Sequence, residues 1–258
     1  MLFSQATCLH TFIPMPAGLY RVHSAFEHAI NLEIPGRREL FSIVTAQKPL
    51  VPQGLKLDVL GLPWIAQGES AFYDGTRFSI GNLVIETQFA RVMDLHIEVE
   101  DGASPVITST LSDMKAWFAL ERASLSPGVS LFNDPSWQAQ LATRVIASEF
   151  DGVVESLLGR GPGLTPSGDD FICGWLWWWT RVNHRDRSKL LEAVRERWQT
   201  TTPISENFLR LMGAGFALEA LKMAESQFAQ GFAFMRQQGA SSGQDTLCGI
   251  DFALQLPR

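Results

Sequence analysis

The sequence predicts an α+β protein, in which a β-rich N-terminal half of antiparallel or barrel-like form precedes an all-helical C-terminal half. Within residues 20–110, short apolar runs alternate with Gly, Pro and Asp, which is the pattern of strands joined by turns. After Thr110 the apolar residues recur every three or four positions, the period of an amphipathic helix. Many short strands without a long helix between them favour an antiparallel sheet or small barrel. We therefore expect two domains, residues 1–124 and residues 125–258.

Two hairpins are predicted in the N-terminal half. The first has the turn-forming sequence P-G-R-R at residues 35–38, between two apolar runs. In the second, Gly81-Asn82 separates two apolar runs, and a two-residue turn of this composition is one that hairpins prefer. The predicted strands are residues 32–34, 40–44, 55–60, 77–80, 83–87 and 95–99.

The helices of the C-terminal half have recognisable starts and ends. Asp134 can cap a helix that begins at Pro135, because proline is favoured at the first helical position. The apolar residues from Trp137 onward keep helical spacing until Gly159, and glycine commonly follows the end of a helix. Residues 125–133 are expected to form the linker. The predicted helices are residues 112–123, 135–158, 168–181, 188–199, 203–222 and 243–254.

The composition is that of an ordinary folded protein. Of the 258 residues, 46% are hydrophobic and 19% are charged, and the formal net charge is −6. This length allows one large core or two modest ones. Proteins that coat nucleic acid need a broad basic surface, so no nucleic-acid partner is expected. An anionic substrate would depend on a local site, because the overall field of the protein is negative.

No signal for secretion, membrane insertion or disulfide bonding is evident. The N-terminal segment lacks a basic region followed by a continuous apolar core, so no signal peptide is expected. The apolar run at residues 171–179 is ended by Arg181 after roughly half of a membrane span. Cys8, Cys173 and Cys248 form no C-x-x-C pair, so neither a disulfide framework nor a zinc site is indicated. These observations favour a cytoplasmic protein without a membrane partner.

One short pattern occurs twice in the C-terminal half. Residues 167–174 and residues 242–249 both read S-G-x-D-x-x-C-G. The eight residues before the first copy, 159–166, contain three glycines and two prolines. A glycine-rich loop that leads into a Ser-capped helix presents free N–H groups and the positive end of the helix dipole at one place. The first copy therefore predicts a binding site for a small anionic substrate.

The predicted substrate-binding residues come from both copies of the pattern. The glycines let the backbone approach a ligand, the arginine supplies charge, and hydroxyl groups lie beside the helix N–H groups. The G-K-[ST] ending of a P-loop and the spacing of a dinucleotide fingerprint are both missing. A simpler interpretation is a relative of the capping box, formed by Ser167 and Asp170. The predicted set is Arg160, Gly161, Gly163, Thr165, Ser167, Gly168, Ser242, Gly243 and Asp245.

Asp169 and Asp170 are the candidate catalytic residues. Neighbouring residues of a helix point about 100° apart, so the two carboxylates cannot form a paired acid–base site by themselves. Either could bind a cation such as Mg²⁺ together with phosphate oxygens, or orient an amide-type substrate. The competing interpretation is that acids at a helix N-terminus only stabilise the helix dipole. The metal is therefore unknown, and Mg²⁺ is the one cofactor that the pattern suggests.

We expect the two copies of the pattern to meet in the folded protein. Helix starts at Ser167 and Ser242 would face one pocket, while Gly174 and Gly249 would allow the two helices to pack closely. Two helix N-termini aimed together could hold a dianion without a dense cluster of basic residues. The alternative is a coincidence of two unrelated caps made of small residues.

Other chemically distinctive residues are expected to be structural. The threonines before Pro203 are typical of an ordinary helix start. His23 and His96 have no evident partners for a catalytic triad, which is recognised by geometry. The tryptophans at positions 175 and 177–179 are too many for one buried helix face, so we expect part of them to contact the N-terminal half or another subunit.

The sequence also resembles a known family. Residues 161–171, G-P-G-L-T-P-S-G-D-D-F, and residues 241–249, S-S-G-Q-D-T-L-C-G, are similar to the third-subunit family of oxamate carbamoyltransferase, found in bacterial operons for anaerobic allantoin use. The resemblance spans nearly the whole chain and includes residues 21–26, R-V-H-S-A-F. The second pattern departs from the family, which usually has histidine and threonine before Ser-Gly and an aromatic residue after it. Here those positions hold Ala240-Ser241 and Gln244.

The resemblance implies a cytoplasmic protein that works with two other subunits to move a carbamoyl group between carbamoyl phosphate and oxamate. A site for these anions needs N–H groups and cationic side chains placed to stabilise developing charge. In one hypothesis, the chain contributes a catalytic or substrate-binding site to the transferase. In the other, it is a non-catalytic binding or assembly subunit whose helix caps are only structural.

Overall fold

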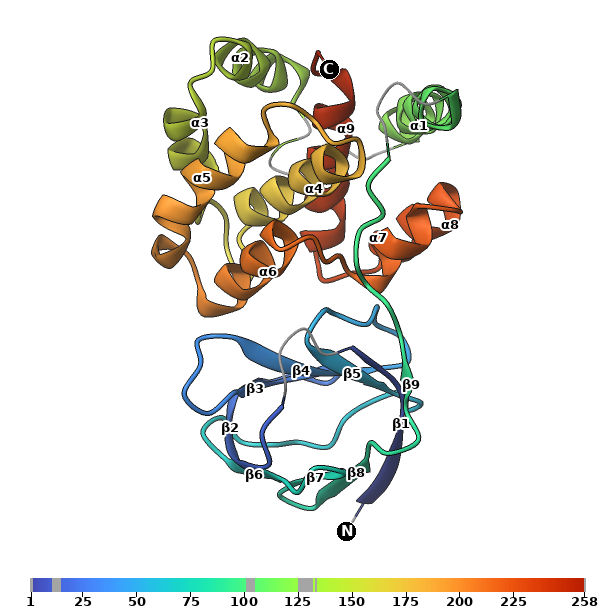
Figure 1. The fold of residues 1–258 in the computed structure, drawn as a ribbon, viewed down its shortest axis with the longest axis vertical. Coiled ribbons are helices and arrows are strands. Elements are labelled where there is room, and N and C mark those ends of the chain that lie inside the picture. The colour runs from blue at the N-terminus through green and yellow to red at the C-terminus, as the bar shows by residue number, and fades with distance from the viewer. Residues whose placement is uncertain (1, 11–14, 101–104, 125–131, 133, 258) are drawn as a thin grey trace. The chain divides into compact units, whose positions relative to one another are not determined.

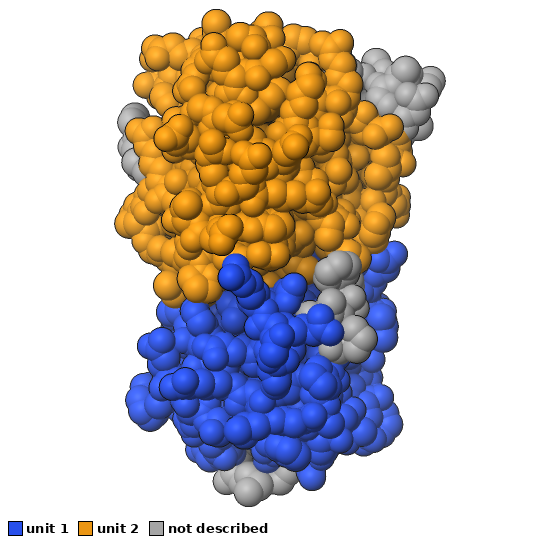
Figure 2. Space-filling model, turned by 60° about the vertical axis from the view of Figure 1, so that its left-hand side comes forward, with its two compact units in different colours: residues 1–95, 218–220 blue, residues 96–217, 221–258 orange. Residues whose placement is uncertain are grey.

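The computed structural model of the chain divides into two compact units. It describes residues 2–10, 15–100, 105–124, 132 and 134–257. Unit 1 comprises residues 1–95 and 218–220, and unit 2 comprises residues 96–217 and 221–258 (Figure 2). Unit 1 is built on a β-sheet and unit 2 on helices (Figure 1). The predicted α+β class is therefore confirmed.

Unit 1 contains one barrel-like sheet. Its strands are β1 (Leu2–His10), β2 (Gly18–Ala25), β3 (Ala29–Glu33), β4 (Leu40–Thr45), β5 (Gly54–Leu57), β6 (Ser70–Tyr73), β7 (Arg77–Ile80), β8 (Leu83–Glu86) and β9 (Arg91–Val92). Their order is β5-β4-β3-β2-β6-β7-β8-β1-β9, and an additional pairing joins β5 back to β1. The β1–β8, β1–β9 and β4–β5 pairs are parallel, and the other pairs are antiparallel.

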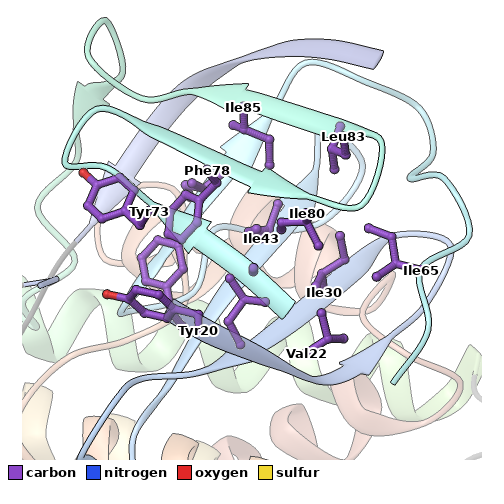
Figure 3. Packing of buried hydrophobic residues seen from close by; sticks show 14 of the residues in the cluster. Tyr20, Val22, Ile30, Ile43, Ile65, Tyr73, Phe78, Ile80, Leu83 and Ile85 are labelled. Carbon is purple, nitrogen blue, oxygen red and sulfur yellow. The ribbon is translucent and has the colours of Figure 1, made fainter. Parts of the chain in front are cut away.

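The core of unit 1 is formed by alternate side chains of these strands (Figure 3). A regular strand places every second side chain on the same face, and Tyr20, Val22 and Ile30 are buried in this way. The ring of Phe78 stacks on Tyr73 at a centroid distance of 4.5 Å and meets the Tyr20 ring edge-on at 5.7 Å. Such aromatic pairs stabilise a core beyond the effect of buried area.

Both predicted hairpins are present. Strand β3 pairs with β4, and β7 pairs with β8 across Gly81-Asn82. Gly81 has φ of 55°, a conformation that glycine adopts without a Cβ penalty. The strand predicted at residues 95–99 is wrong, since only His96 forms a β-bridge, to Phe216 of unit 2. The apolar run at residues 95–99 does not by itself indicate that Phe216, the bridge partner of His96, lies between two helices.

Glu219, from the C-terminal half of the sequence, belongs to unit 1. Its N–H donates to the Leu50 carbonyl at 2.9 Å, and its carboxylate accepts the Leu50 N–H at 2.7 Å. The same carboxylate pairs with Lys56, which is buried in β5. A buried ammonium group needs such a partner, because an unpaired charge is costly to remove from water.

The helices centre on two that pack together, α4 and α9 (Figure 1). The helices are α1 (Pro105–Ser124), α2 (Pro135–Ile146), α3 (Phe150–Leu157), α4 (Ser167–Arg181), α5 (Arg187–Arg197), α6 (Pro203–Gly213), α7 (Glu219–Ala224), α8 (Phe228–Met235) and α9 (Ser242–Gln255). As predicted, Asp134 caps α2, accepting the Ser136 N–H at 2.8 Å. The predicted linker at residues 125–133 lies outside the described residues except for Phe132.

Two helices predicted as continuous are interrupted. Residues 135–158, predicted as one helix, form α2 and α3, and Ser148 between them has φ of 61°. Residues 203–222 belong to α6 and α7, and Gly215 between them has φ of 91°. A positive φ ends a right-handed helix, and hydrophobic periodicity does not report it. Helix α8 was not predicted, since its three phenylalanines and one glycine have low helix propensity.

Helices α4 and α9 cross at glycines of the repeated pattern. Gly174 of α4 lies against the Thr246 carbonyl of α9, and Gly249 of α9 lies against the Phe171 carbonyl of α4. A Cβ atom at either glycine would overlap that oxygen. Both glycines are the eighth residue of the pattern, and both carbonyl groups belong to the fifth. The crossing is therefore symmetric, as the predicted close packing requires.

The second residue of each copy makes a corresponding contact. A Cβ at Gly168 would overlap the Leu157 carbonyl at the end of α3, and one at Gly243 would overlap the Met235 carbonyl at the end of α8. Each pattern thus fixes the angle between its own helix and the helix before it. Unit 2 therefore contains two similar helix–loop–helix elements, α3–α4 and α8–α9, joined through their second helices.

The tryptophans of α4 are buried by its neighbours in unit 2. Trp175, Trp177, Trp178 and Trp179 are at most 3% exposed. The rings of Trp175 and Trp177 meet those of Phe252 and Phe232 at centroid distances of 5.1 and 6.1 Å. Helices of the same unit therefore surround α4 on several sides. No helix in the described part of the chain is both long and apolar enough to cross a membrane.

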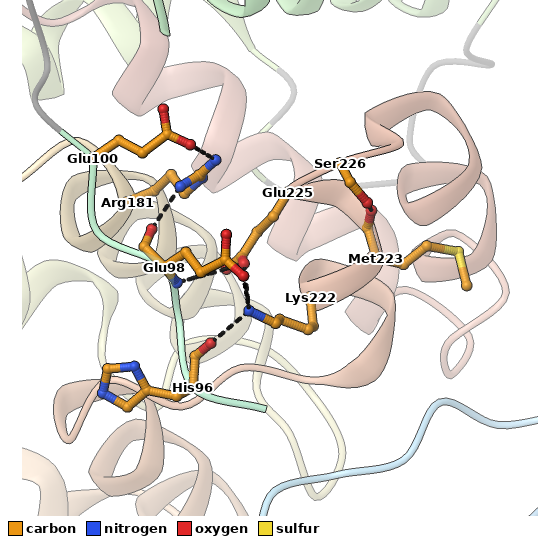
Figure 4. Close-up of polar contacts among 8 residues, drawn as sticks. All are labelled: His96, Glu98, Glu100, Arg181, Lys222, Met223, Glu225 and Ser226. Carbon is orange, nitrogen blue, oxygen red and sulfur yellow. Dashed lines mark hydrogen bonds and ion pairs between the residues drawn. The ribbon is translucent and has the colours of Figure 1, made fainter. Parts of the chain in front are cut away.

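Ionic contacts hold the first segment of unit 2 to its helices (Figure 4). Lys222 donates to the His96 carbonyl at 2.9 Å and to the carboxylates of Glu98 and Glu225 at 3.0 and 2.8 Å. The Arg181 side chain, at the end of α4, donates to the Glu98 carbonyl at 2.7 Å. These contacts hold the backbone of residues 96–98 against the helices of unit 2.

The glycine crossing makes a prediction about stability. We expect Gly174→Ala and Gly249→Ala each to lower the free energy of unfolding by about 3 kcal/mol or more, because the new methyl group must displace backbone. The matched control is Gly152→Ala in α3, where a Cβ meets only the flexible end of Arg144. That change should be neutral or raise stability by up to ~1 kcal/mol. Urea unfolding measures all three, and equal effects in α3 and α4 would contradict the crossing.

Candidate functional site

The two copies of the repeated pattern begin α4 and α9, but their serines are not N-caps. Ser167 and Ser242 are the first helical residues, and neither helix has a side-chain cap hydrogen bond. The predicted Ser caps, including the capping box of Ser167 with Asp170, are therefore wrong. The Pro166 carbonyl instead accepts the N–H groups of Asp169 and Asp170 at 2.9 and 3.2 Å. A backbone carbonyl thus satisfies these two N–H groups of the first turn, which leaves the side chains for other contacts.

The loop before α4 keeps several N–H groups available. Those of Gly161, Gly163, Leu164, Thr165 and Ser167 make no hydrogen bond to another described residue. Gly161 and Gly163 have φ of 119° and 95°, conformations that side chains other than hydrogen disfavour. Most of the loop is at least partly exposed. Free N–H groups beside a helix N-terminus are the usual backbone elements of an anion site.

Asp169 ties this loop to the neighbouring helix α6. Its Oδ1 accepts the Gly159 N–H at 2.7 Å, and its Oδ2 accepts the Thr201 hydroxyl. Thr202, the N-cap of α6, donates its hydroxyl to the Leu164 carbonyl. Asp169 is 1% exposed, and both of its oxygens are engaged. This geometry is that of a residue that positions the loop.

Asp170 lies beside the start of α9. Its carboxyl group interacts with the hydroxyls of Thr165 and Ser242. Those two hydroxyl oxygens are 2.7 Å apart, so the loop before α4 touches the first residue of α9. The Oδ2 atom of Asp170 is buried and has no hydrogen-bond partner among the described residues. Asp170 therefore keeps one carboxyl oxygen without a partner among the described residues, in contrast to Asp169.

Burial is the largest cause of the raised pKa values of Asp169 and Asp170. It raises the pKa of Asp170 well above its ordinary range, and the charges of Asp245 and Asp169 add to the effect. Burial also raises the pKa of Asp169, although the Gly159 N–H and the Thr201 hydroxyl oppose this. A protonated carboxyl group can donate a hydrogen bond, which a carboxylate cannot. The Cys173 thiol likewise has its pKa raised well above its usual range by burial, so it is not an activated nucleophile.

The remaining predicted site residues lie at helix contacts, inside the first turn of α9 or at the beginning of the loop. Gly168 and Gly243 pack against preceding helices, and Asp245 is fully buried in the first turn of α9. Arg160 is exposed at the beginning of the loop, with its guanidinium carbon 5.8 Å from the centroid of the Phe132 ring.

Thr201 and Thr202 are site residues that the sequence did not predict. The T-T-P sequence indicated a helix start, and Thr202 does cap α6 by accepting the Ser205 N–H at 3.1 Å. The same two threonines also hold Asp169 and Leu164. These partners are more than thirty positions away in sequence, so no local pattern reveals them.

The described residues offer no evident metal site. Among them, no group of three or more His, Cys, Asp or Glu side chains is arranged to hold a metal ion. Asp169 and Asp170, the acids for which Mg²⁺ was considered, instead contact N–H and hydroxyl groups. The donor set therefore does not fit a Mg²⁺ ion, which prefers several oxygen ligands in octahedral geometry.

Two protein-family models match the chain. Residues 7–92 match the AllH family N-terminal domain, and residues 157–254 match the model described as oxamate carbamoyltransferase subunit AllH. Together these ranges cover most of the chain, and the second contains every predicted site residue. No solved structure matches the chain.

The contrast between the two aspartates can be tested through stability. We expect Asp170→Asn to raise the melting temperature at pH 7, because folding raises the pKa of the Asp170 carboxyl group. Such a group stabilises the folded state fully only below about pH 4, and this contribution is lost as the pH rises. The difference from the wild type should shrink towards pH 4. Asp169→Ala should instead cost about 1–3 kcal/mol, since it leaves the Gly159 N–H without its acceptor. Melting curves from pH 4 to 7 measure both, and a destabilised Asp170→Asn variant would contradict the assignment.

Proposed function

Because this chain belongs to the AllH family of oxamate carbamoyltransferase subunits, we propose that it supplies an anion-binding site to a complex that moves a carbamoyl group between carbamoyl phosphate and oxamate. The proposed site is the loop at residues 161–167 together with the start of α9. The observation that carries this proposal is the set of loop N–H groups without a partner among the described residues, beside a helix start. Two other subunits complete the proposed complex, which works in the cytoplasm.

Helix N-termini supply the positive potential that this acidic chain otherwise lacks. Three helices, α4, α6 and α9, begin at the loop or at residues that contact it, namely Ser167, the N-cap Thr202 and Ser242. Each N-terminus carries roughly half of a positive charge, which acts over about one turn. A phosphate or carboxylate bound here would be stabilised locally, although the net charge of the chain is −6.

Asp170 has a specific role in this proposal. An ionised carboxylate beside the loop would repel an anion, whereas a neutral carboxyl group would donate a hydrogen bond to it. The raised pKa of Asp170 supports the neutral form, and its unpartnered Oδ2 supplies the contacting atom. Thr165 and Ser242 would then orient the carboxyl group through their hydroxyls.

The same groups suit the chemistry of carbamoyl transfer. As the amide nitrogen of oxamate attacks the carbamoyl carbon, negative charge develops on the carbonyl oxygen and on the departing phosphate. Fixed N–H donors stabilise such charge without having to reorganise. Arg160 would contact the phosphate from the beginning of the loop, and Asp169 would keep the loop in position without touching the reacting atoms.

A non-catalytic assembly role has one observation in its favour. Leu19 and Phe72 are neighbours across strands β2 and β6 and are 64% and 50% exposed, and Trp64 is 87% exposed. Exposed apolar side chains of this size are typical of surfaces that bind other proteins. In this alternative the loop N–H groups remain hydrated and the chain binds no substrate.

Calorimetric titration of the purified chain separates these two functions. We expect carbamoyl phosphate, oxamate or inorganic phosphate to bind, with Arg160→Gln weakening the binding roughly tenfold, as the loss of one charge-assisted hydrogen bond does. Ser242→Ala should also weaken binding, because it removes a hydroxyl that holds Asp170.

Arg185→Gln is the matched control, since Arg185 is also exposed but lies in the turn between α4 and α5. It should leave the dissociation constant unchanged. If none of the three anions binds the chain, either alone or reconstituted with its partner subunits, the assembly role replaces the proposed one.

A further inference from the structure

A row of polar side chains crosses the sheet of unit 1. Ser24 of β2 lies directly opposite Asn31 of β3, and Asn31 lies directly opposite Ser42 of β4. Their neighbours Ile30, Leu32 and Phe41 belong to the hydrophobic core. Because strand side chains alternate between faces, the polar row lies on the face of the sheet opposite to that core.

A β-bulge places Ser24 in this row. Tyr20 and Val22 of β2 point into the core, so in a regular strand Ser24 would follow them inward. The register shifts between Val22 and Ser24, which leaves His23 as the extra residue and pairs Ala25 with Ile30 on the core side. Bulges often re-aim a side chain next to a functional site. Here the bulge turns a serine hydroxyl outward beside a histidine.

The hydrogen bonds of the row run in one direction. The Ser42 hydroxyl donates to Asn31 Oδ1 at 2.7 Å, and Asn31 Nδ2 donates to Ser24 Oγ at 3.0 Å. Ser24 Oγ lies 3.2 Å from Nδ1 of His23. Ser24 Oγ accepts from Asn31, and it donates its own proton to Nδ1 of His23 when the imidazole is neutral and protonated at Nε2. Each donor in such a chain strengthens the next hydrogen bond.

This arrangement has the components of an activated nucleophile. A serine hydroxyl becomes reactive when a base within hydrogen-bond distance can take its proton. His23 is in place as that base, and the Asn31 amide would stabilise the negative charge that develops on Ser24 Oγ. Asn31 and Ser42 are 8% and 5% exposed, whereas His23 and Ser24 are partly exposed. The reactive pair is therefore accessible, while the side chains that position it are buried.

We propose that Ser24 is a nucleophile, with His23 as its base, for compounds that carry an activated carbonyl group. Ser24 Oγ forms a bond to the carbonyl carbon, and the hydroxyl proton passes to Nδ1 of His23. The bond from that carbon to the leaving group then breaks, and the leaving group takes the proton from His23. The products are an ester or carbamate on Ser24 and the protonated leaving group. This site uses no residue of the loop before α4, so it holds or fails independently of the anion site.

Covalent labelling of the full chain tests this inference. Incubation with p-nitrophenyl acetate should place one acetyl group on Ser24, identified by peptide mass spectrometry, and release p-nitrophenolate. His23→Gln should slow the labelling about a hundredfold or more, the usual contribution of a positioned base. Asn31→Ala should slow it less, because it removes only the amide that stabilises the oxygen.

The controls separate this nucleophile from general reactivity of the chain. Ser70→Ala removes another exposed serine from strand β6 and should leave the labelling rate unchanged. His28→Gln removes a histidine outside the row and should do the same. Carbamoyl phosphate as a second probe should give the corresponding carbamoyl adduct at Ser24. A folded wild-type chain without an adduct at Ser24, or His23→Gln labelled at the wild-type rate, would overturn the proposal.

Discussion

The close crossing of α4 and α9 is the constraint on which the rest of unit 2 depends. Gly174 and Gly249 bring each helix against a backbone carbonyl of the other, at a distance that no residue with a Cβ could reach. Because both glycines occupy the same position of the repeated pattern, the crossing point is equally far from both helix starts. The contact between Thr165 and Ser242 brings the two helix starts together.

The properties of the candidate site follow from this crossing. Close packing buries the acids of the first turns, and burial raises the pKa of both Asp169 and Asp170. The two acids then differ in their partners. Asp169 is fully engaged in holding the loop to α6, whereas Asp170 keeps one buried oxygen without a partner among the described residues. Such a group lowers stability at neutral pH, and proteins commonly accept that cost where a ligand binds.

The features that were predictable from sequence are those that depend on local chemistry. Gly81-Asn82 connects the two strands of a hairpin and Asp134 caps a helix, as their residue types predict. The repeated glycines correctly predicted closely packed helices. The features that were missed depend on residues distant in sequence. The bond from Thr202 to Leu164 joins two loops that only the packing of α6 brings together. The bulge at His23 is visible only once β2 is aligned with β3.

Disulfide trapping tests most directly whether the two patterns form one site. In the double variant Thr165→Cys with Ser242→Cys, we predict rapid formation of a disulfide under mild oxidation, since the native hydroxyl oxygens are 2.7 Å apart. The disulfide should also block anion binding, and reduction should restore the weaker binding expected of a site without these two hydroxyls. Thr165→Cys with Gln255→Cys, at the other end of α9, should not cross-link. If the first pair stays reduced in a folded protein, the two helix starts do not meet and the account of the site is contradicted.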